Sequence, residues 1–268
     1  YVFEARFWPV FNFRNIVITL GKQIFDTVLF LKTSWCIFES RASSPSAPIA
    51  LKMATDMWSE WVASCGYSER TIFVVGGLIA HSATFWTLNA FYYLCYRNEW
   101  WPELKIQGKA LPNFELAKEC VVHCMINHFC VAPFTLYFGF PLLKACGMDF
   151  TSPIPDWTIF VRDFLVGILV NDTLFYWGHR LLHHKSIYKY VHAQHHSFKV
   201  NVGVSSEYAH PLEHLFSNLV PVAGNMIMGT HIIVFWAWLI FRVGEIVDTH
   251  SGYEFKWSPY VIDCLANV

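Results

Sequence analysis

A run of 26 residues, Thr71–Tyr96, contains no Asp, Glu, Lys or Arg. A helix needs about 20 consecutive apolar residues to cross the hydrocarbon core of a bilayer, so this run predicts a membrane-spanning helix. The composition agrees, because 54% of all residues are hydrophobic and only 15% are charged, whereas soluble proteins carry about 25% charged residues. The sequence therefore predicts an integral membrane protein.

Two further spans are predicted downstream. Cys120–Leu143 is apolar and should bend near Pro133, because proline removes a helical hydrogen bond. Trp157–Trp177 is the third span. The next apolar run, Leu215–Val247, is 33 residues long, too long for one crossing and too short for two crossings with a turn. A shallow re-entrant hairpin, entering and leaving on one side, fits this length. The predicted fold is an all-α membrane bundle of about three full spans plus this hairpin.

The N-terminal region differs from the rest. It lacks an initial Met, and Arg14, Lys22 and Asp26 interrupt its apolar run. A Ser- and Pro-rich stretch then leads to Met53. Residues 1–52 are therefore interpreted as an extension of the natural chain, with an amphipathic interfacial segment as the alternative. Residues 53–268 form the predicted domain.

Charge sets the expected orientation. Basic residues follow the first span, whereas acidic residues precede it, so the positive-inside rule places the end of that span in the cytosol. Those basic residues are Arg97, Lys105, Lys109 and Lys118. The net charge of −1 and the pI near 6.9 offer no basic face for nucleic acid. Eight Cys without a Cys-x-x-Cys pair favour reduced thiols.

Histidine is concentrated in one window. Residues 178–213 hold seven of the 13 His in the chain. His179 and His183 are four residues apart, which places both imidazoles on one helical face. His192, His195 and His196 repeat offsets of three and four, which predicts a second helical face. The window contains no Cys, and its imidazoles are too many for one ion, which favours two transition metals. The alternative is a solvated His-rich helix that binds metal adventitiously.

Four motifs carry a family resemblance. They are HRLLH (179–183), HAQHH (192–196), SEYAHPLE (206–213) and VDTHSGYEFKWSP (247–259). The chain resembles the fatty acid hydroxylase and sterol desaturase superfamily over about Trp101–Tyr260, and most narrowly its C-4 methylsterol monooxygenase branch. Members carry a third box, His-x-x-His-His, after the HSGY segment. Its absence before Val268 leads us to expect a sequence truncated at the C-terminus.

The resemblance extends the candidate site. It adds His210 and His250 to the five His of the two boxes, giving as expected ligands His179, His183, His192, His195, His196, His210 and His250. Groups expected to support these ligands are Asp172, His184 and Glu213. Asp172 could equally hydrogen-bond another helix, and His184 could be a spectator. Structural roles are expected for the remaining candidates, His81, His123, His128, His214 and His231.

The resemblance also implies a function. It implies a membrane monooxygenase of the endoplasmic reticulum that uses two iron ions and O2 to oxidise the C-4 methyl group of sterol precursors, with its active site facing the cytosol. Electrons would come from NAD(P)H through a reductase and cytochrome b5, since the chain has no GxGxxG or haem motif of its own. Other enzymes of sterol C-4 demethylation are possible partners. The alternatives are another lipid hydroxylase or desaturase of the superfamily, acting on fatty acyl, sphingolipid or sterol side chains, and a non-catalytic membrane protein with an incomplete metal site.

Overall fold

The computed structural model describes residues 49–256 and 258. The chain divides into two units, Tyr1–Ile49 and Ala50–Val268, and the elements below belong to the second. The interpretation of residues 1–52 lies outside the described residues except at its end, where helix α2 (Ile49–Ser64) begins. Within the described part the regular structure is helical, with two isolated β-bridges and no strand. The predicted all-α fold class is confirmed for that part.

The first predicted span is helix α3 (Glu69–Arg97). Ser68 caps its start by accepting a hydrogen bond from Thr71 N at 3.2 Å, and Asn98 ends it. Only 22% of its apolar window is buried, so most of its apolar side chains face outward, unlike those of a soluble core helix. Such exposure favours a helix surrounded by lipid.

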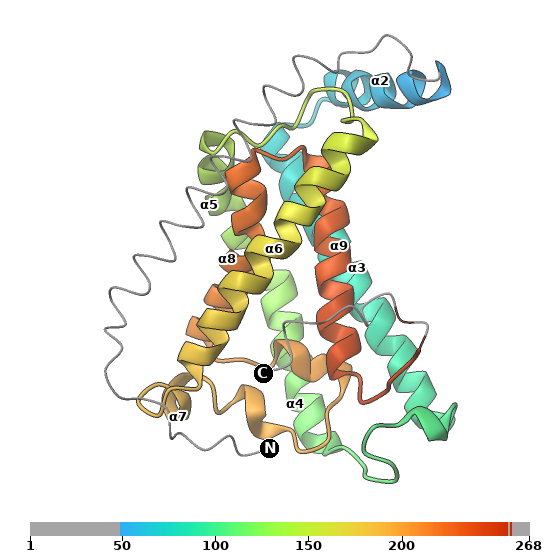
Figure 1. Cartoon of the computed structure of the whole chain (residues 1–268), viewed down its shortest axis with the longest axis vertical. Helices are drawn as coiled ribbons and strands as arrows, with labels where there is room; N and C mark the ends of the chain where they lie inside the picture. Colours follow the sequence, from blue (N-terminus) through green and yellow to red (C-terminus); the bar gives the residue numbers. More distant parts are fainter. Residues whose placement is uncertain (1–48, 257, 259–268) are drawn as a thin grey trace. The chain divides into compact units, whose positions relative to one another are not determined.

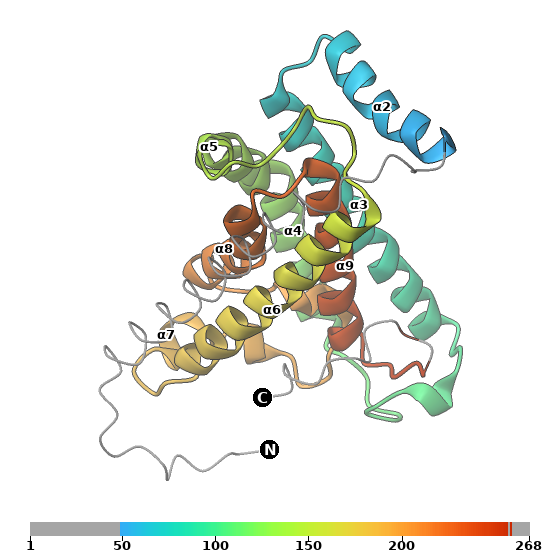
Figure 2. The ribbon, with the colours of Figure 1, turned by 45° about the horizontal axis from the view of Figure 1, so that its top comes forward.

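The second predicted span is a helix in three parts: α4 (Phe114–Ile126), the π-helix η2 (Asn127–Val131) and α5 (Ala132–Ala145). Together they form the second helix among the described residues that is long and apolar enough to cross a membrane, and 17% of its window is buried. The widened π turn comes directly before Pro133, whose ring needs room near the carbonyl of the preceding turn. The helix changes direction there, between α4 and α5 (Figures 1 and 2).

The third predicted span is helix α6 (Trp157–Leu182), capped by Asp156 and five residues longer than expected. It contains Arg162, Asp163, Asp172 and Arg180, and it is not among the helices apolar enough to cross a membrane by composition. Arg162 Nε donates to Asp163 Oδ1 at 2.7 Å, so two of these charges neutralise each other. The extra turn carries His179.

The predicted hairpin consists of α8 (Pro211–Met228) and α9 (Ile232–His250). Gly229, with φ of 62°, ends α8 in the left-handed conformation that glycine adopts without strain. The turn reaches the loop between α5 and α6, where Ile232 N donates to Asp149 O at 2.8 Å. Helix α8 continues through Pro221 to this turn, and the shallow entry of the hairpin into the membrane remains a prediction.

The candidate site lies at one end of this helical unit. The C-terminal ends of α3, α6 and α9 and the start of α4 gather there (Figure 1). Backbone and side-chain contacts join the connecting segments: Ile106 N donates to Gly252 O at 3.0 Å, and Gln107 Nε2 donates to Lys199 O at 2.8 Å. The short elements of this end are η1 (Pro102–Leu104), α7 (Tyr188–Val191), η3 (His195–Ser197) and η4 (Gly203–Glu207).

Helices α6 and α8 pack closely through glycine. A Cβ added at Gly224 would lie 2.9 Å from the Cα of Gly167 and 3.3 Å from Val166 O. Neither neighbour is the end of a flexible side chain, so even a methyl group must push the backbones apart. This contact fixes the distance between the helix that carries His179 and the helix that carries Glu213.

We predict that Gly224→Ala destabilises the protein by about 1–3 kcal/mol, as overpacking of a tight contact does. Thermal unfolding in detergent micelles measures this. The matched control is Gly139→Ala in α5, where an added Cβ meets nothing within 4 Å and the better helix propensity of Ala makes the change neutral or stabilising. Equal unfolding midpoints for the two variants would contradict the packing described.

Candidate metal centre

The first histidine pair comes from the end of α6. His179 lies in the last turn and His183 is the C-cap residue, with its N–H bonded to His179 O at 3.0 Å. The spacing of four residues brings their Nε2 atoms within 3.2 Å of each other. The sequence spacing therefore places both imidazoles on one helical face, as expected.

The second histidine group does not lie on one helical face. Helix α7 ends at Val191, His192 is its C-cap, and His195 and His196 belong to a 3-10 turn in which His196 leaves helical geometry. The expectation of a second helix with three aligned imidazoles is wrong. The irregular turn divides the group, so His192 and His196 face the first pair while His195 faces His250.

Four Nε2 atoms converge at the centre of this arrangement. The His192 nitrogen lies 3.0 Å from that of His179, 3.2 Å from that of His183 and 2.9 Å from that of His196. The nitrogens of His183 and His196 are 3.2 Å apart. An imidazole nitrogen binds a first-row metal at about 2 Å, so neighbouring ligands of one ion lie about 3 Å apart. These four side chains fit one metal ion.

Hydrogen bonding alone does not account for this convergence. Each neutral Nε2 presents either one N–H or one lone pair. Among the three nitrogens of His179, His183 and His192, all within 3.2 Å of each other, at least two are therefore alike and repel. A cation would remove this conflict, because each of the four nitrogens could direct a lone pair at it.

Glu213 fixes the orientation of His192. Its Oε1 lies 2.7 Å from His192 Nδ1, and both residues are buried, at 4% and 1% exposure. Nδ1–H donates to the carboxylate, which leaves the lone pair on Nε2, directed at the other three imidazoles. Carboxylate–imidazole pairs of this kind orient metal ligands and raise their basicity. Glu213 thus makes the contact that a supporting group requires.

Burial and neighbouring imidazoles favour the neutral forms of His195 and His196. Burial, with the neighbouring imidazole of His250, lowers the pKa of His195 to about 2. Burial, with the neighbouring imidazole of His192, lowers the pKa of His196 to about 4. Both side chains are therefore unprotonated at neutral pH, which is the form that binds metal.

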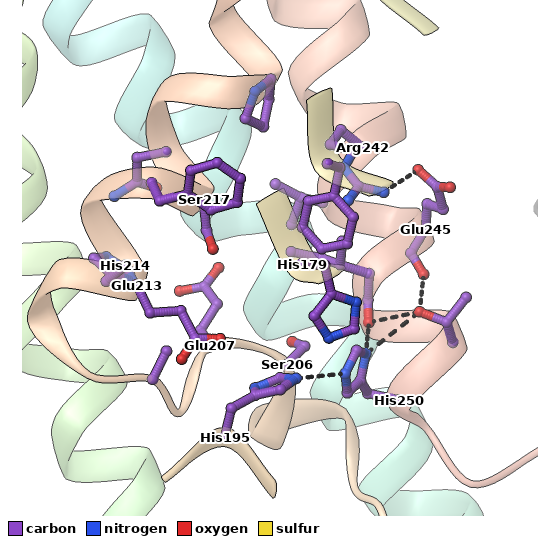
Figure 3. Close-up of a pocket in the computed structure, with 18 of the residues that line it drawn as sticks. His179, His195, Ser206, Glu207, Glu213, His214, Ser217, Arg242, Glu245 and His250 are labelled. Carbon is purple, nitrogen blue, oxygen red and sulfur yellow. Dashed lines mark hydrogen bonds and ion pairs between the residues drawn. The ribbon is translucent and has the colours of Figure 1, made fainter. Parts of the chain in front are cut away.

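A second, smaller group adjoins the first. His250 Nε2 lies 3.4 Å from His195 Nε2, and its Nδ1 lies 2.8 Å from Ile246 O. The Nδ1–H donates to that carbonyl, so the lone pair of Nε2 faces His195. Figure 3 shows this pair beside His179. The two imidazoles fit part of the ligand set of a second ion.

Three other predicted site residues lie elsewhere. His210 is the N-cap of α8, where its Nδ1 accepts from Leu212 N at 3.2 Å. His184 is exposed, and its Nδ1 accepts from Ser186 N at 3.4 Å. Asp172 accepts from Asn171 Nδ2 at 3.1 Å. None of these contacts reaches the converging imidazoles, and the metal-related roles of these residues remain predictions.

Sequence reasoning did not identify a second polar cluster. His128 was expected to be buried and hydrogen-bonded, and its Nε2 does bond Glu207 Oε2 at 2.7 Å. His81 Nε2 lies 3.1 Å from Glu207 Oε1. Arg242, buried at 7% exposure, pairs with Glu245 at 2.6 Å. The sequence did contain one indication of these contacts, namely ionisable residues within apolar segments. Burying such groups in a membrane costs free energy, so they usually have a function.

A cavity of about 400 Å³ opens beside the imidazoles, between α6, α8 and α9 (Figure 3). His179, His192, His195 and His250 line one part of it. Much of the remaining wall is apolar and includes Phe175, Phe216, Trp238, Leu239, Val243 and Ile246. Ligand pockets have volumes of about 300–1,000 Å³ and this mixture of apolar wall and few polar groups. The cavity therefore has the size and lining of a small-molecule site.

Several known proteins are similar to this chain in sequence. The family model described as fatty acid hydroxylase matches residues 164–267. The chain is 37% identical over 195 residues to very-long-chain aldehyde decarbonylase GL1-8 of Oryza sativa subsp. indica, covering 72% of each chain. It is 34% identical over 193 residues to methylsterol monooxygenase 2-1 of Arabidopsis thaliana, covering 72% of this chain and 71% of the relative.

A fungal relative is also similar. C-4 methylsterol oxidase of Candida albicans is 36% identical over 159 residues, which cover 58% of this chain and 52% of the relative. No solved structure matches.

We predict that Glu213→Gln weakens metal binding about 10- to 100-fold, the usual effect of removing the partner that orients a ligating imidazole. Titration of the apoprotein with Fe(II) or Co(II) measures the affinity. Glu115→Gln is the matched control, because Glu115 is exposed and pairs with Lys118 at 2.8 Å. Unchanged affinity in Glu213→Gln would show that His192 does not need this carboxylate.

Proposed function

Because this chain belongs to the fatty acid hydroxylase family, we propose that it is a membrane monooxygenase that oxidises the C-4 methyl group of sterol precursors with two iron ions and O2. The convergence of four imidazole nitrogens beside an apolar cavity carries the proposal. The identity of 34–36% with proteins named methylsterol monooxygenase and C-4 methylsterol oxidase supports this choice of substrate.

In this proposal, the imidazoles bind iron and the cavity wall binds the lipid. His179, His183, His192 and His196 would hold one iron, and His195 with His250 would contribute to the second. Iron would supply the O2-dependent oxidation of an unactivated C–H bond, which protein side chains do not perform. Glu213 keeps the lone pair of His192 directed into the site.

The cavity wall positions the substrate. Phe175 of α6, Phe216 of α8 and Trp238 of α9 present apolar surface, so an apolar ring system is held by packing and water is excluded. Arg242 and Glu245 neutralise each other in the same wall. Their pairing avoids an isolated charge beside an apolar substrate.

We place the metal centre at the cytosolic face of the endoplasmic reticulum membrane. Exposed basic side chains surround it, namely Arg180, Lys185, Lys189 and Lys199, and the positive-inside rule favours the cytosol for such an end. Electrons would reach it from NAD(P)H through a reductase and cytochrome b5. Basic side chains at this end would favour docking of an acidic donor surface.

A very-long-chain aldehyde is a second candidate substrate. The identity of 37% with a protein named for decarbonylation of such aldehydes favours it. An unbranched chain and a fused ring system differ in width, so the same apolar cavity would hold them differently. Product analysis separates the two.

We predict that membranes containing the full chain, supplied with NADPH, a reductase, cytochrome b5 and O2, oxidise a 4,4-dimethylsterol stepwise to its C-4 carboxylic acid. His192→Ala should lower the rate more than about 100-fold, because losing a ligand exceeds the loss of its orienting partner. Glu115→Gln, a change at an exposed residue of α4, should retain activity.

Mass spectrometry of the extracted lipids identifies the products of this assay. Hydroxylated acyl chains or shortened aldehydes, with the C-4 methyl groups left intact, would refute the sterol proposal.

A further inference from the structure

A buried carboxylate lies in the wall of the cavity, outside the histidine cluster. Glu207, in η4, is 6% exposed. Two imidazoles from separate membrane-facing helices approach it, His81 of α3 and His128 of the π-helix η2. Irregular π turns recur at functional sites because they redirect side chains. Here the π turn directs His128 inward, where it is 2% exposed.

The two carboxylate oxygens differ in their bonding. Oε2 accepts from His128 Nε2–H at 2.7 Å. Oε1 forms an ion pair with His81 Nε2 at 3.1 Å, but it is buried without an aligned hydrogen bond. A carboxylate oxygen has two lone pairs, and a buried one is stabilised by well-aligned donors. Oε1 therefore has acceptor capacity left for a ligand.

The cavity provides the place for a donor. Glu207 and His81 line the same cavity as His179, His195 and His250. Figure 3 shows Glu207 and His214 across from the His195–His250 pair. A ligand lying in the cavity therefore meets both the candidate metal centre and a charged acceptor, and in a 4-methylsterol the C-3 hydroxyl is next to the C-4 methyl group. In an apolar cavity, a ligand hydroxyl can donate a hydrogen bond to this carboxylate. A ligand without a donor leaves the carboxylate oxygen without that bond.

A metal ion is the competing occupant, since the ligand atoms of His81, His128 and Glu207 lie within 4.8 Å of one another. The chemistry differs from that of the four-nitrogen cluster, however. An imidazole N–H and a carboxylate oxygen attract each other without an ion, so the 2.7 Å contact of His128 is complete as a hydrogen bond. A hydrogen bond from a ligand to Glu207 therefore explains this cluster without a metal ion.

We propose that Glu207, positioned by His81 and His128, binds the hydroxyl group of the lipid substrate and selects lipids with a free hydroxyl over those in which it is blocked. The inference rests on the proposed function, which it deepens: an apolar sterol precursor carries a hydroxyl at the end of its ring system, and Glu207 accepts its hydrogen bond. The carboxylate thereby sets how the substrate lies relative to the imidazoles.

A competition binding assay tests this by changing the ligand and leaving the protein unaltered. The full, metal-containing chain in detergent micelles is incubated with a radiolabelled 4-methylsterol. The label is then displaced with either the unlabelled sterol or its 3-O-methyl ether. The ether should bind at least about tenfold more weakly, since a hydrogen bond to a charged group is lost. Equal affinities would overturn the proposal.

Variants test whether Glu207 is the residue that produces the preference for the free hydroxyl. Glu207→Gln keeps the side-chain volume but removes the charge, and the preference for the free hydroxyl should fall to less than about threefold. Ser217→Ala, a change at another polar residue of the cavity wall, should leave the preference intact. An undiminished preference in a folded Glu207→Gln protein would overturn the assignment to Glu207. Loss of a bound metal equivalent in that variant, with no preference in the parent, would instead assign the cluster to metal.

The outcomes separate this inference from the proposed function. A protein that prefers the free hydroxyl but leaves C-4 methyl groups unoxidised retains the inference and loses the proposed reaction. A protein that oxidises the alcohol and its ether equally well retains the reaction and loses the inference.

Discussion

Four imidazole nitrogens facing one another at 2.9–3.2 Å are the constraint on which the rest of the structure depends. Neutral imidazoles cannot all satisfy one another at this distance, whereas a metal ion satisfies all of them at once. Glu213 commits the lone pair of His192 to this centre. The fold therefore holds together, at one end of its helices, a group of side chains whose lone pairs a cation would satisfy.

The helices supply this geometry through a few specific contacts. The close approach of Gly167 and Gly224 sets the separation of α6 and α8, which carry His179 and Glu213. The α8–α9 hairpin returns the chain so that His250 meets His195. Arg242 and Glu245 form an ion pair inside this apolar framework, where an unpaired charge would be costly. The same packing leaves a cavity of about 400 Å³ beside the imidazoles.

Local sequence patterns predicted local structure well. The apolar runs indicated α3 and the α4–α5 helix, the proline indicated the site of the bend, and the spacing of four residues put His179 and His183 on one face. The contacts that depend on tertiary structure could not be read this way. The spacing of His192, His195 and His196 suggested one helix, but the chain turns there and divides them.

The other contacts that the sequence analysis did not predict join residues far apart along the chain. Glu207 is 126 residues from His81 and 79 from His128, so their cluster had no local pattern. The position of the α8–α9 turn likewise depends on the contact of Asp149 with Ile232, which run length alone does not reveal.

X-ray absorption at the iron K-edge of the iron-loaded full chain tests the central claim most directly. The structure predicts a first coordination shell dominated by nitrogen at about 2 Å, with the outer-shell scattering that imidazole rings produce. Iron that binds without imidazole scattering, or a chain that retains no iron, would contradict an imidazole-held metal centre.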